Sequence, residues 1–339
     1  MTMTMLMSRI VLGIGGLAVL FIGLLTVISY YFYYVAIKRN SKAFLSNNQD
    51  LAQIHGEKEM DDQAAIALAD ESGPTPVEAI GVEWIEKQAY EIWHLTSSDG
   101  LSLVGYYLEA KTLTSKTVIL AHGYSSQGKD MGSFAKFYYD KLGYNVLMPD
   151  DRGHGDSEGD YIGFGWPDRK DYLLWIDEVV QKLGESVQIV LHGISMGGAT
   201  VMMVSGENVP KQVKVIVEDC GYTSVTDQLS YQLKRMYKLP AFPILPATSL
   251  LTRLKAGYSF EEASAIKQLD KNKLPMFFIH GSADTFVPTE MVWRLYEACK
   301  ADKDIYIAEG AGHGMSYGTD TTAYEQKVAA FLSRYVMNG

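Results

Sequence analysis

A serine between two glycines follows a short apolar segment, and it is the residue best suited to act as a nucleophile. The motif spans residues 193–197 (Gly-Ile-Ser-Met-Gly), with Ser195 at its centre, and the apolar segment covers residues 187–192. Glycines two residues before and after the serine let a buried strand turn sharply into a helix without a clash between Cβ atoms. The turn strains the serine backbone and directs the hydroxyl away from the sheet. The same pattern also fits an ordinary strand-to-helix turn, so the rest of the sequence must decide.

A serine nucleophile needs a base, and His313 is the histidine that we assign to this role. It lies in a glycine-rich loop, residues 310–314, between the last expected strand and the last amphipathic helix. Such a loop can bring the imidazole over the sheet edge toward Ser195. A loop histidine without a catalytic role is the alternative. Three other histidines indicate structural roles because each ends an apolar strand and precedes a glycine, namely His122, His192 and His280.

The base needs a carboxylate to orient it, and two aspartates follow buried strands. Asp284 lies in the loop after the segment 275–280, and Asp219 ends the segment 213–219. We favour Asp284, because the short loop after its strand can turn a carboxylate toward His313. The alternatives are that Asp284 caps a helix or turn and that Asp219 is the acid.

An oxyanion hole requires backbone N–H groups at the place where negative charge develops on the substrate. Met196 directly follows the serine, so its N–H is one candidate donor. The second donor should come from the loop after the apolar segment 117–121, which begins His-Gly-Tyr. The N–H of Tyr124 is therefore the other candidate.

These motifs stand in the same order as in the α/β-hydrolase superfamily, which the chain resembles over roughly residues 88–338. The resemblance rests on residues 122–124, the serine motif, residues 281–284 and the pair Gly312-His313. Within the superfamily, the chain is similar to uncharacterised membrane-anchored serine hydrolases of Gram-positive bacteria. The resemblance implies an α/β fold with a mostly parallel, eight-stranded sheet, helices on both faces and a small helical cap.

The pattern of apolar segments predicts the same architecture. An Asp-Gly turn joins two alternating segments, 90–96 and 101–109, which is typical of a β-hairpin. Six further segments are apolar throughout and alternate with helical patterns, which indicates a parallel sheet covered by helices. They are residues 117–121, 144–148, 188–192, 213–218, 275–280 and 304–308.

Residues 222–262 interrupt this alternation, because they are too long for a single crossover helix. In α/β-hydrolases an insertion at this place covers the pocket. We therefore expect a helical cap whose apolar residues, such as Tyr237 and Phe242, set the acyl length of the substrate. The segment also carries basic residues, such as Arg253 and Lys255. They fit attraction of an anionic substrate or of anionic lipid, and equally a solvated face whose stems cover apolar surface.

Residues 10–37 contain no charged side chain over 28 positions, which exceeds the roughly 20 residues needed to cross a bilayer. The tyrosine-rich end of this segment precedes Lys38 and Arg39, as at a membrane interface. We predict a single-pass anchor in the cell membrane over residues 1–39, followed by a polar linker or helical decoration over residues 40–87. A cleaved signal peptide is the alternative, and the membrane side of the catalytic domain stays open. Because the anchor is about 50 residues from the first strand in sequence, it need not contact the pocket, and we expect it to be dispensable for catalysis.

The composition limits the remaining possibilities. A chain of 339 residues that is 47% hydrophobic can build one large domain with an additional segment. A net charge of −10 argues against nucleic acid as a partner. Cys220 and Cys299 fit no disulfide or zinc pattern and are expected to be buried free thiols. The sequence implies no metal and no organic cofactor, and it leaves the oligomeric state open.

The sequence therefore predicts a carboxylesterase-like serine hydrolase that cleaves the acyl bond of a small-molecule ester or thioester. Ser195 would form an acyl-enzyme with the help of His313 and Asp284. A serine peptidase or aminoacyl amidase is one alternative, because such enzymes share this fold and these residues. An alternative of another class is a membrane-tethered binding protein on a catalytically retired hydrolase scaffold. Retired scaffolds usually lose one of the catalytic residues or motif glycines, and this sequence keeps them all.

Overall fold

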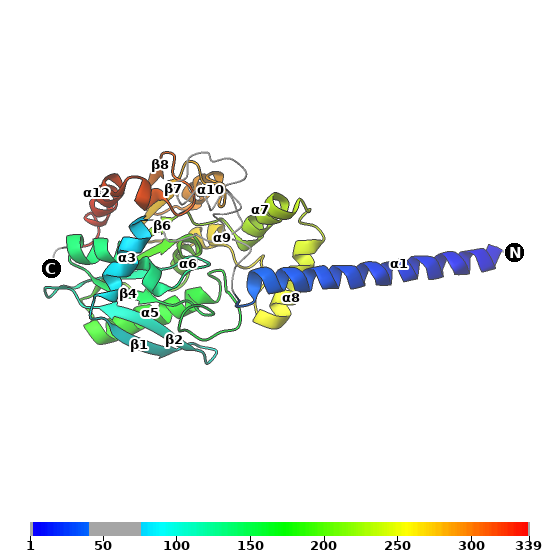
Figure 1. Ribbon diagram of the computed structural model, residues 1–339, viewed down its shortest axis with the longest axis horizontal. Helices are drawn as coiled ribbons and strands as arrows, with labels where there is room; N and C mark the ends of the chain where they lie inside the picture. The colour runs from blue at the N-terminus through cyan, green and yellow to red at the C-terminus, as the bar shows by residue number, and fades with distance from the viewer. Residues whose placement is uncertain (1–2, 41–75, 338–339) are drawn as a thin grey trace, which may run out of the picture.

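The computed structural model describes residues 3–40 and 76–337, and an eight-stranded sheet forms its centre (Figure 1). The strand order is β1-β2-β4-β3-β5-β6-β7-β8. The hairpin β1–β2 is antiparallel, β2 runs antiparallel to β4, and the other neighbours are parallel. The predicted fold class is therefore confirmed. The strands are β1 (Glu91–Thr96), β2 (Ser102–Leu108), β3 (Lys116–Ala121), β4 (Asn145–Pro149), β5 (Gln188–Ile194), β6 (Val213–Asp219), β7 (Met276–Gly281) and β8 (Lys303–Ala308).

Side chains of the central strands alternate between two apolar cores, one on each face of the sheet. In β5, Leu191 lies in the first core and Val190 in the second. The first core is covered by α5 (Asp168–Leu183), α6 (Met196–Ser205), α9 (Ala265–Leu269) and α10 (Glu290–Ala298). The second is covered by α3 (Pro76–Glu86), α4 (Gly132–Lys136), the π-helix η4 (Phe137–Leu142) and α12 (Thr321–Leu332). The short elements η3 (Gly128–Met131) and α11 (Ser316–Thr319) join neighbouring segments.

Helix α3 lies within the stretch that the sequence suggests is a linker. It packs on α4, with Ile85 buried and the Trp84 ring edge-on to Tyr139 at 5.6 Å. Residues 41–75 of the predicted linker or helical decoration lie outside the described residues.

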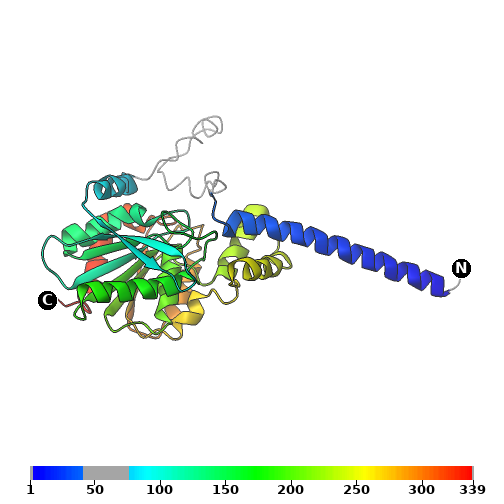
Figure 2. The same ribbon diagram turned by 90° about the horizontal axis from the view of Figure 1, so that it is seen from below.

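The apolar N-terminus forms one long helix that projects from the rest of the molecule (Figures 1 and 2). Helix α1 (Met3–Phe32) continues into the π-helix η1 (Tyr33–Ile37). The stretch Leu12–Ile37 is long enough to cross a membrane and has a mean hydropathy of 2.4. Membrane anchors and signal sequences share these properties.

The expected cap is present as two helices at the base of α1. They are α7 (Val225–Tyr237) and α8 (Ile244–Ala256), and α8 packs against α1. The Phe32 ring meets the Tyr237 ring edge-on at 5.0 Å, so α7 also contacts the helix end. Both figures show α7 and α8 gathered around this end of α1.

The end of the N-terminal helix is docked on the domain, which argues against the expectation that the anchor is dispensable for catalysis. Ile37 is fully buried, and its carbonyl accepts a hydrogen bond from the N–H of Ile162 at 2.7 Å. The Arg39 guanidinium donates to the carbonyls of Ser157 and Gly155, both at 2.7 Å. Distance along the chain did not predict this, because segments far apart in sequence can pack together.

Candidate active site

Ser195 occupies a sharp turn between β5 and α6. Its backbone has φ 57° and ψ −113°, a conformation that non-glycine residues rarely adopt. A Cβ atom on Gly193 would lie 2.1 Å from the carbonyl oxygen of Gly197, and one on Gly197 would lie 2.0 Å from that of Ala121. Only glycine fits at either position, so the two glycines of the motif allow the strand, turn and helix to approach this closely.

Three loops at the carboxyl end of the sheet bring Ser195, His313 and Asp284 into one hydrogen-bonded chain. The Ser195 Oγ lies 2.8 Å from Nε2 of His313, and Nδ1 of His313 lies 2.8 Å from Oδ2 of Asp284. The second oxygen of Asp284 accepts from the N–H groups of Phe286 and Val287, both at 2.9 Å. An ionised carboxylate only accepts hydrogen bonds, so it places a proton on Nδ1 of His313 and leaves Nε2 free to accept from the serine.

Asp284 is buried, yet its surroundings keep it ionised. Burial alone would raise its pKa, but the neighbouring His313 ring and the hydrogen bonds from His280 and His313 hold the pKa well below its usual range. Asp284 thus carries a negative charge next to the His313 ring.

His280 is a part of the site that the sequence analysis placed among structural residues. Its Nε2 lies 3.2 Å from Oδ2 of Asp284 and 2.9 Å from the carbonyl oxygen of Val287. Two imidazoles therefore contact the same carboxylate oxygen. The spacing of four residues between His280 and Asp284 across a strand end is the only sequence signal of this contact.

Asp219, the alternative acid, lies in a separate buried network. Its two oxygens accept from the hydroxyls of Ser316 at 3.1 Å and Tyr324 at 3.0 Å. The Tyr324 hydroxyl in turn lies 3.1 Å from Nε2 of His192. Burial raises the pKa of Asp219 to about 6. This carboxyl links the last helices to the sheet.

The two candidate oxyanion donors border Ser195. Met196 begins α6, where backbone N–H groups have no acceptor within the helix. The loop with Tyr124 passes close to the serine, because a Cβ atom on Gly123 would lie 3.7 Å from the Cβ of Ser195. Tyr124 and Met196 both line the cavity beside Ser195. The arrangement is suited to stabilising an oxyanion at this point.

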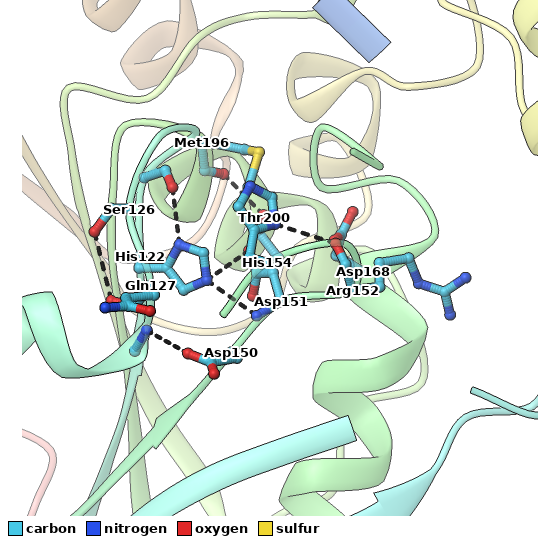
Figure 3. A network of polar contacts seen from close by, with 12 residues as sticks. His122, Ser126, Gln127, Asp150, Asp151, Arg152, His154, Asp168, Met196 and Thr200 are labelled. Carbon is cyan, nitrogen blue, oxygen red and sulfur yellow. Dashed lines mark hydrogen bonds and ion pairs between the residues drawn. The ribbon is translucent and has the colours of Figure 1, made fainter. Parts of the chain in front are cut away.

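Two buried histidines, His122 and His154, contact the backbone of the Tyr124 loop, and their rings lie next to each other (Figure 3). Nδ1 of His122 donates to the carbonyl of Gly123 at 2.8 Å, and its Nε2 accepts from the N–H of Asp151 at 3.0 Å. Nε2 of His154 lies 2.9 Å from the carbonyl oxygen of Tyr124. Burial lowers the pKa of His154 to about 3, so the ring is neutral near pH 7. The sequence showed only that His154 lies in a loop.

An apolar cavity adjoins Ser195, and three parts of the chain provide much of its wall. The helix end contributes Phe32, Val35, Ala36 and Ile37, the cap contributes Leu229, Leu233, Met236, Tyr237 and Leu245, and the loop of Asp284 contributes Phe286 and Val287. None of the described residues that line it is charged. Tyr237 therefore lies where the sequence predicted, whereas Phe242 does not, because its side chain is 77% exposed on the outside of the cap.

One group of side chains near the serine has the composition of a metal site. Ligand-type atoms of Cys220, Asp284 and His313 lie within 4.8 Å of one another. The hydrogen bonds of Asp284 and His313 already account for two of them. Burial raises the pKa of the Cys220 thiol well above its usual value, which disfavours the thiolate that binds metals. Cys220 and Cys299 are both buried and free, as predicted.

Comparison with known proteins agrees with this geometry. Residues 130–339 match the prolyl oligopeptidase family. The uncharacterised protein YqkD of Bacillus subtilis is 32% identical over 250 residues, which cover 74% of this chain and 80% of YqkD. The monoglyceride lipase of Mus musculus is 24% identical over 65% of this chain and 82% of its own length. Among solved structures, the esterase Pf2001 of Pyrococcus furiosus has a TM-score of 0.60 and 25% identity, covering 74% of this chain and 91% of the esterase. The chain belongs to the prolyl oligopeptidase family, within the α/β-hydrolase superfamily.

Proposed function

We propose that the protein is a serine hydrolase that cleaves esters or thioesters with an apolar acyl group. The observation that carries this proposal is the hydrogen-bonded chain from Ser195 through His313 to Asp284, which ends at an apolar cavity. Its similarity to an esterase and to a monoglyceride lipase supports ester chemistry.

In the proposed reaction, the same residues act first in acylation of Ser195 and then in deacylation. His313 takes the proton of Ser195 as its Oγ attacks the acyl carbonyl, and Asp284 stabilises the resulting imidazolium. The N–H groups of Tyr124 and Met196 stabilise the oxyanion. The imidazolium then protonates the leaving alcohol or thiol, which leaves an acyl-enzyme. A water molecule, deprotonated by His313, attacks this ester and releases the acid.

The lining of the cavity favours an acyl chain over a peptide. A peptidase of this family is the second candidate, because the chain matches the prolyl oligopeptidase family. An aminopeptidase-like enzyme would need an acidic side chain to pair with the amine of its substrate. The described residues of the cavity wall include no such group. The intact chain of hydrogen bonds at Ser195 argues against a retired scaffold.

The location of the cavity wall favours an uncleaved membrane anchor over a signal peptide. Cleavage after the apolar helix would remove Phe32 and Ile37, which line the cavity, and would expose apolar surface next to Ser195. We therefore propose that residues 1–39 stay in the mature protein and hold it at the cell membrane.

A fluorophosphonate probe tests the proposed nucleophile. The full-length protein in detergent should react with the probe, and Ser195→Ala should abolish labelling and lower ester turnover by a factor of about 10⁴ or more. Ser333→Ala, which changes an exposed serine at the end of α12, is the control and should leave both unchanged. Labelling of the Ser195→Ala protein would contradict the mechanism. A panel of acyl esters, acyl thioesters and aminoacyl amides then separates the hydrolase from the peptidase candidate.

A further inference from the structure

A line of exposed apolar residues runs along the outside of the cap. Phe242, Pro246, Leu250 and Leu254 follow one another at intervals of four residues, and we call them the cap ridge. Pro246, Leu250 and Leu254 lie in α8, where this spacing places side chains on one face, and Phe242 lies just before the helix. Phe242 is 77% exposed, Leu250 60% and Leu254 76%, so the ridge presents apolar side chains where a water-facing helix would have polar ones.

The cap ridge is continuous with the apolar surface of the N-terminal helix. Helix α8 packs on α1, and the Nζ atom of Lys255, next to Leu254, lies 5.4 Å from the centre of the Tyr30 ring and 5.8 Å from that of Tyr33. Tyr30 and Tyr31 are about half exposed, at 49% and 50%. Tyrosines and lysines gather in this way at the membrane–water interface. The apolar helix and the cap ridge therefore form one surface.

The elements that carry this surface also enclose the cavity. Phe32 and Val35 belong to the helix end, and Leu245 lies on the inner side of α8, whose outer side carries Leu250. If α1 spans a bilayer, the cavity beside Ser195 begins at the membrane surface, because the end of the helix lines the cavity. An acyl chain could then reach the cavity without passing through water.

We infer that the cap ridge rests in the bilayer and that the substrate is a membrane-resident lipid ester whose acyl chain enters the cavity between the end of α1 and the cap. The inference builds on the proposed serine hydrolase function. In the reaction, the bond between the acyl carbon and the lipid oxygen breaks and a bond to the Ser195 Oγ forms. The serine proton passes through His313 to the leaving lipid alcohol. Water then supplies the hydroxyl of the released fatty acid and restores the proton of Ser195.

Two substrates separate this inference from the proposed function. Full-length protein is reconstituted in vesicles of phosphatidylcholine with one-fifth phosphatidylglycerol and assayed with a diacylglycerol in the bilayer and with a water-soluble butyrate ester. The ridge variant is Leu250→Glu with Leu254→Glu. The matched control is Ile92→Glu with Leu113→Glu, two residues that are 55% and 102% exposed and lie outside the cap.

The ridge variant should hydrolyse the diacylglycerol about tenfold more slowly and the butyrate ester at an unchanged rate, and the control should change neither. Equal loss on both substrates, or no loss on either, would overturn the inference. Butyrate hydrolysis by the wild type that is not abolished in Ser195→Ala would instead refute the proposed function.

A fluorescent label gives a second measurement that does not depend on turnover. Both native cysteines are buried, so an environment-sensitive dye can be attached selectively to Leu254→Cys or to Ile92→Cys. In vesicles, emission at position 254 should shift to the blue and be quenched by brominated lipid, whereas position 92 should report water. The same emission at both positions would place the ridge outside the membrane.

Discussion

The catalytic loops around Ser195 and the apolar wall of the cavity are built from different kinds of segment. Ser195, Asp284 and His313 each follow a strand closely, so the carboxyl edge of the sheet brings them together. The wall combines the cap with the end of a helix that lies outside the sheet altogether. Under the proposed function, the chemistry could therefore stay constant while the acyl specificity and the membrane contact change with the wall.

Replacing each of the two candidate acids, Asp284 and Asp219, is the sharpest test of the catalytic loops. Asp284→Asn should lower turnover by about 10³ to 10⁴, because an amide does not hold His313 in the required tautomer. Asp219→Asn should instead lower the melting temperature, since the Asp219 carboxyl accepts from Ser316 and Tyr324. Ester turnover and thermal unfolding of both variants measure this, and the reverse ranking in turnover would make Asp219 the acid.

The apolar wall of the cavity includes the end of the N-terminal helix, which truncation can remove. Protein that contains residues 40–339 should lose most ester turnover and melt on the order of 10 °C lower, because it lacks the buried Ile37 and the Arg39 hydrogen bonds. Protein that contains residues 21–339 keeps the docked end and should behave as the full chain in detergent. Equal stability and turnover of the two truncated proteins would show that the docked end contributes nothing to the site.

A bulkier side chain inside the cap should change the acyl preference by about tenfold. Leu229 lines the cavity, so Leu229→Trp should reduce turnover of long-chain esters relative to acetate esters. Phe242→Trp is the control, because Phe242 lies outside the cavity. The ratio of kcat/KM for the two chain lengths measures the effect. An equal change in both variants would contradict the assignment of the inner and outer faces of the cap.

The smallest effect concerns His192, which lies behind the serine on β5. Burial lowers its pKa to about 3, so the folded state keeps the ring neutral while the unfolded chain takes up a proton below about pH 6.5. The stability that the folded protein gains from a neutral His192 is therefore present above this pH and is lost as the pH falls. His192→Phe should be less stable than the wild type at pH 7.5, since it leaves the hydroxyls of Tyr138 and Tyr324 without the ring. Urea unfolding should show that the difference in free energy of unfolding between the wild type and His192→Phe is about 2 kcal/mol smaller at pH 5 than at pH 7.5. The same difference at both pH values would contradict a lowered pKa of His192.

The sheet and the sequence positions around Ser195 were predictable because each rests on a local pattern. Apolar segments predict the strands of the sheet, and the spacing of Gly193, Ser195 and Gly197 predicts the turn, although the contact that requires Gly197 is with the distant carbonyl of Ala121. The preference for Asp284 over Asp219 rested only on the short loop after its strand, because both aspartates follow buried strands. What distinguishes them is the position of Ser316 and Tyr324, which belong to later helices.

Contacts between distant segments had no sequence signal. Arg39 donates to the carbonyls of Gly155 and Ser157, and backbone acceptors leave no mark in the amino-acid sequence. Phe242 shows the complementary difficulty. Its apolar character suggested a place in the cavity, but only the direction of α8 decides which residues of the cap face inward.

In the proposed orientation, the docked end of the N-terminal helix also fixes the distance between Ser195 and the hydrocarbon layer of the membrane. Because Ile37 is buried in the domain and Phe32 lines the cavity, Ser195 cannot move toward or away from the helix without breaking those contacts. In the proposed orientation, the nucleophile keeps a constant elevation above the hydrocarbon layer. The depth at which a lipid is cut is then a property of the fold, and the length of the segment that joins the helix to α3 has no influence on it.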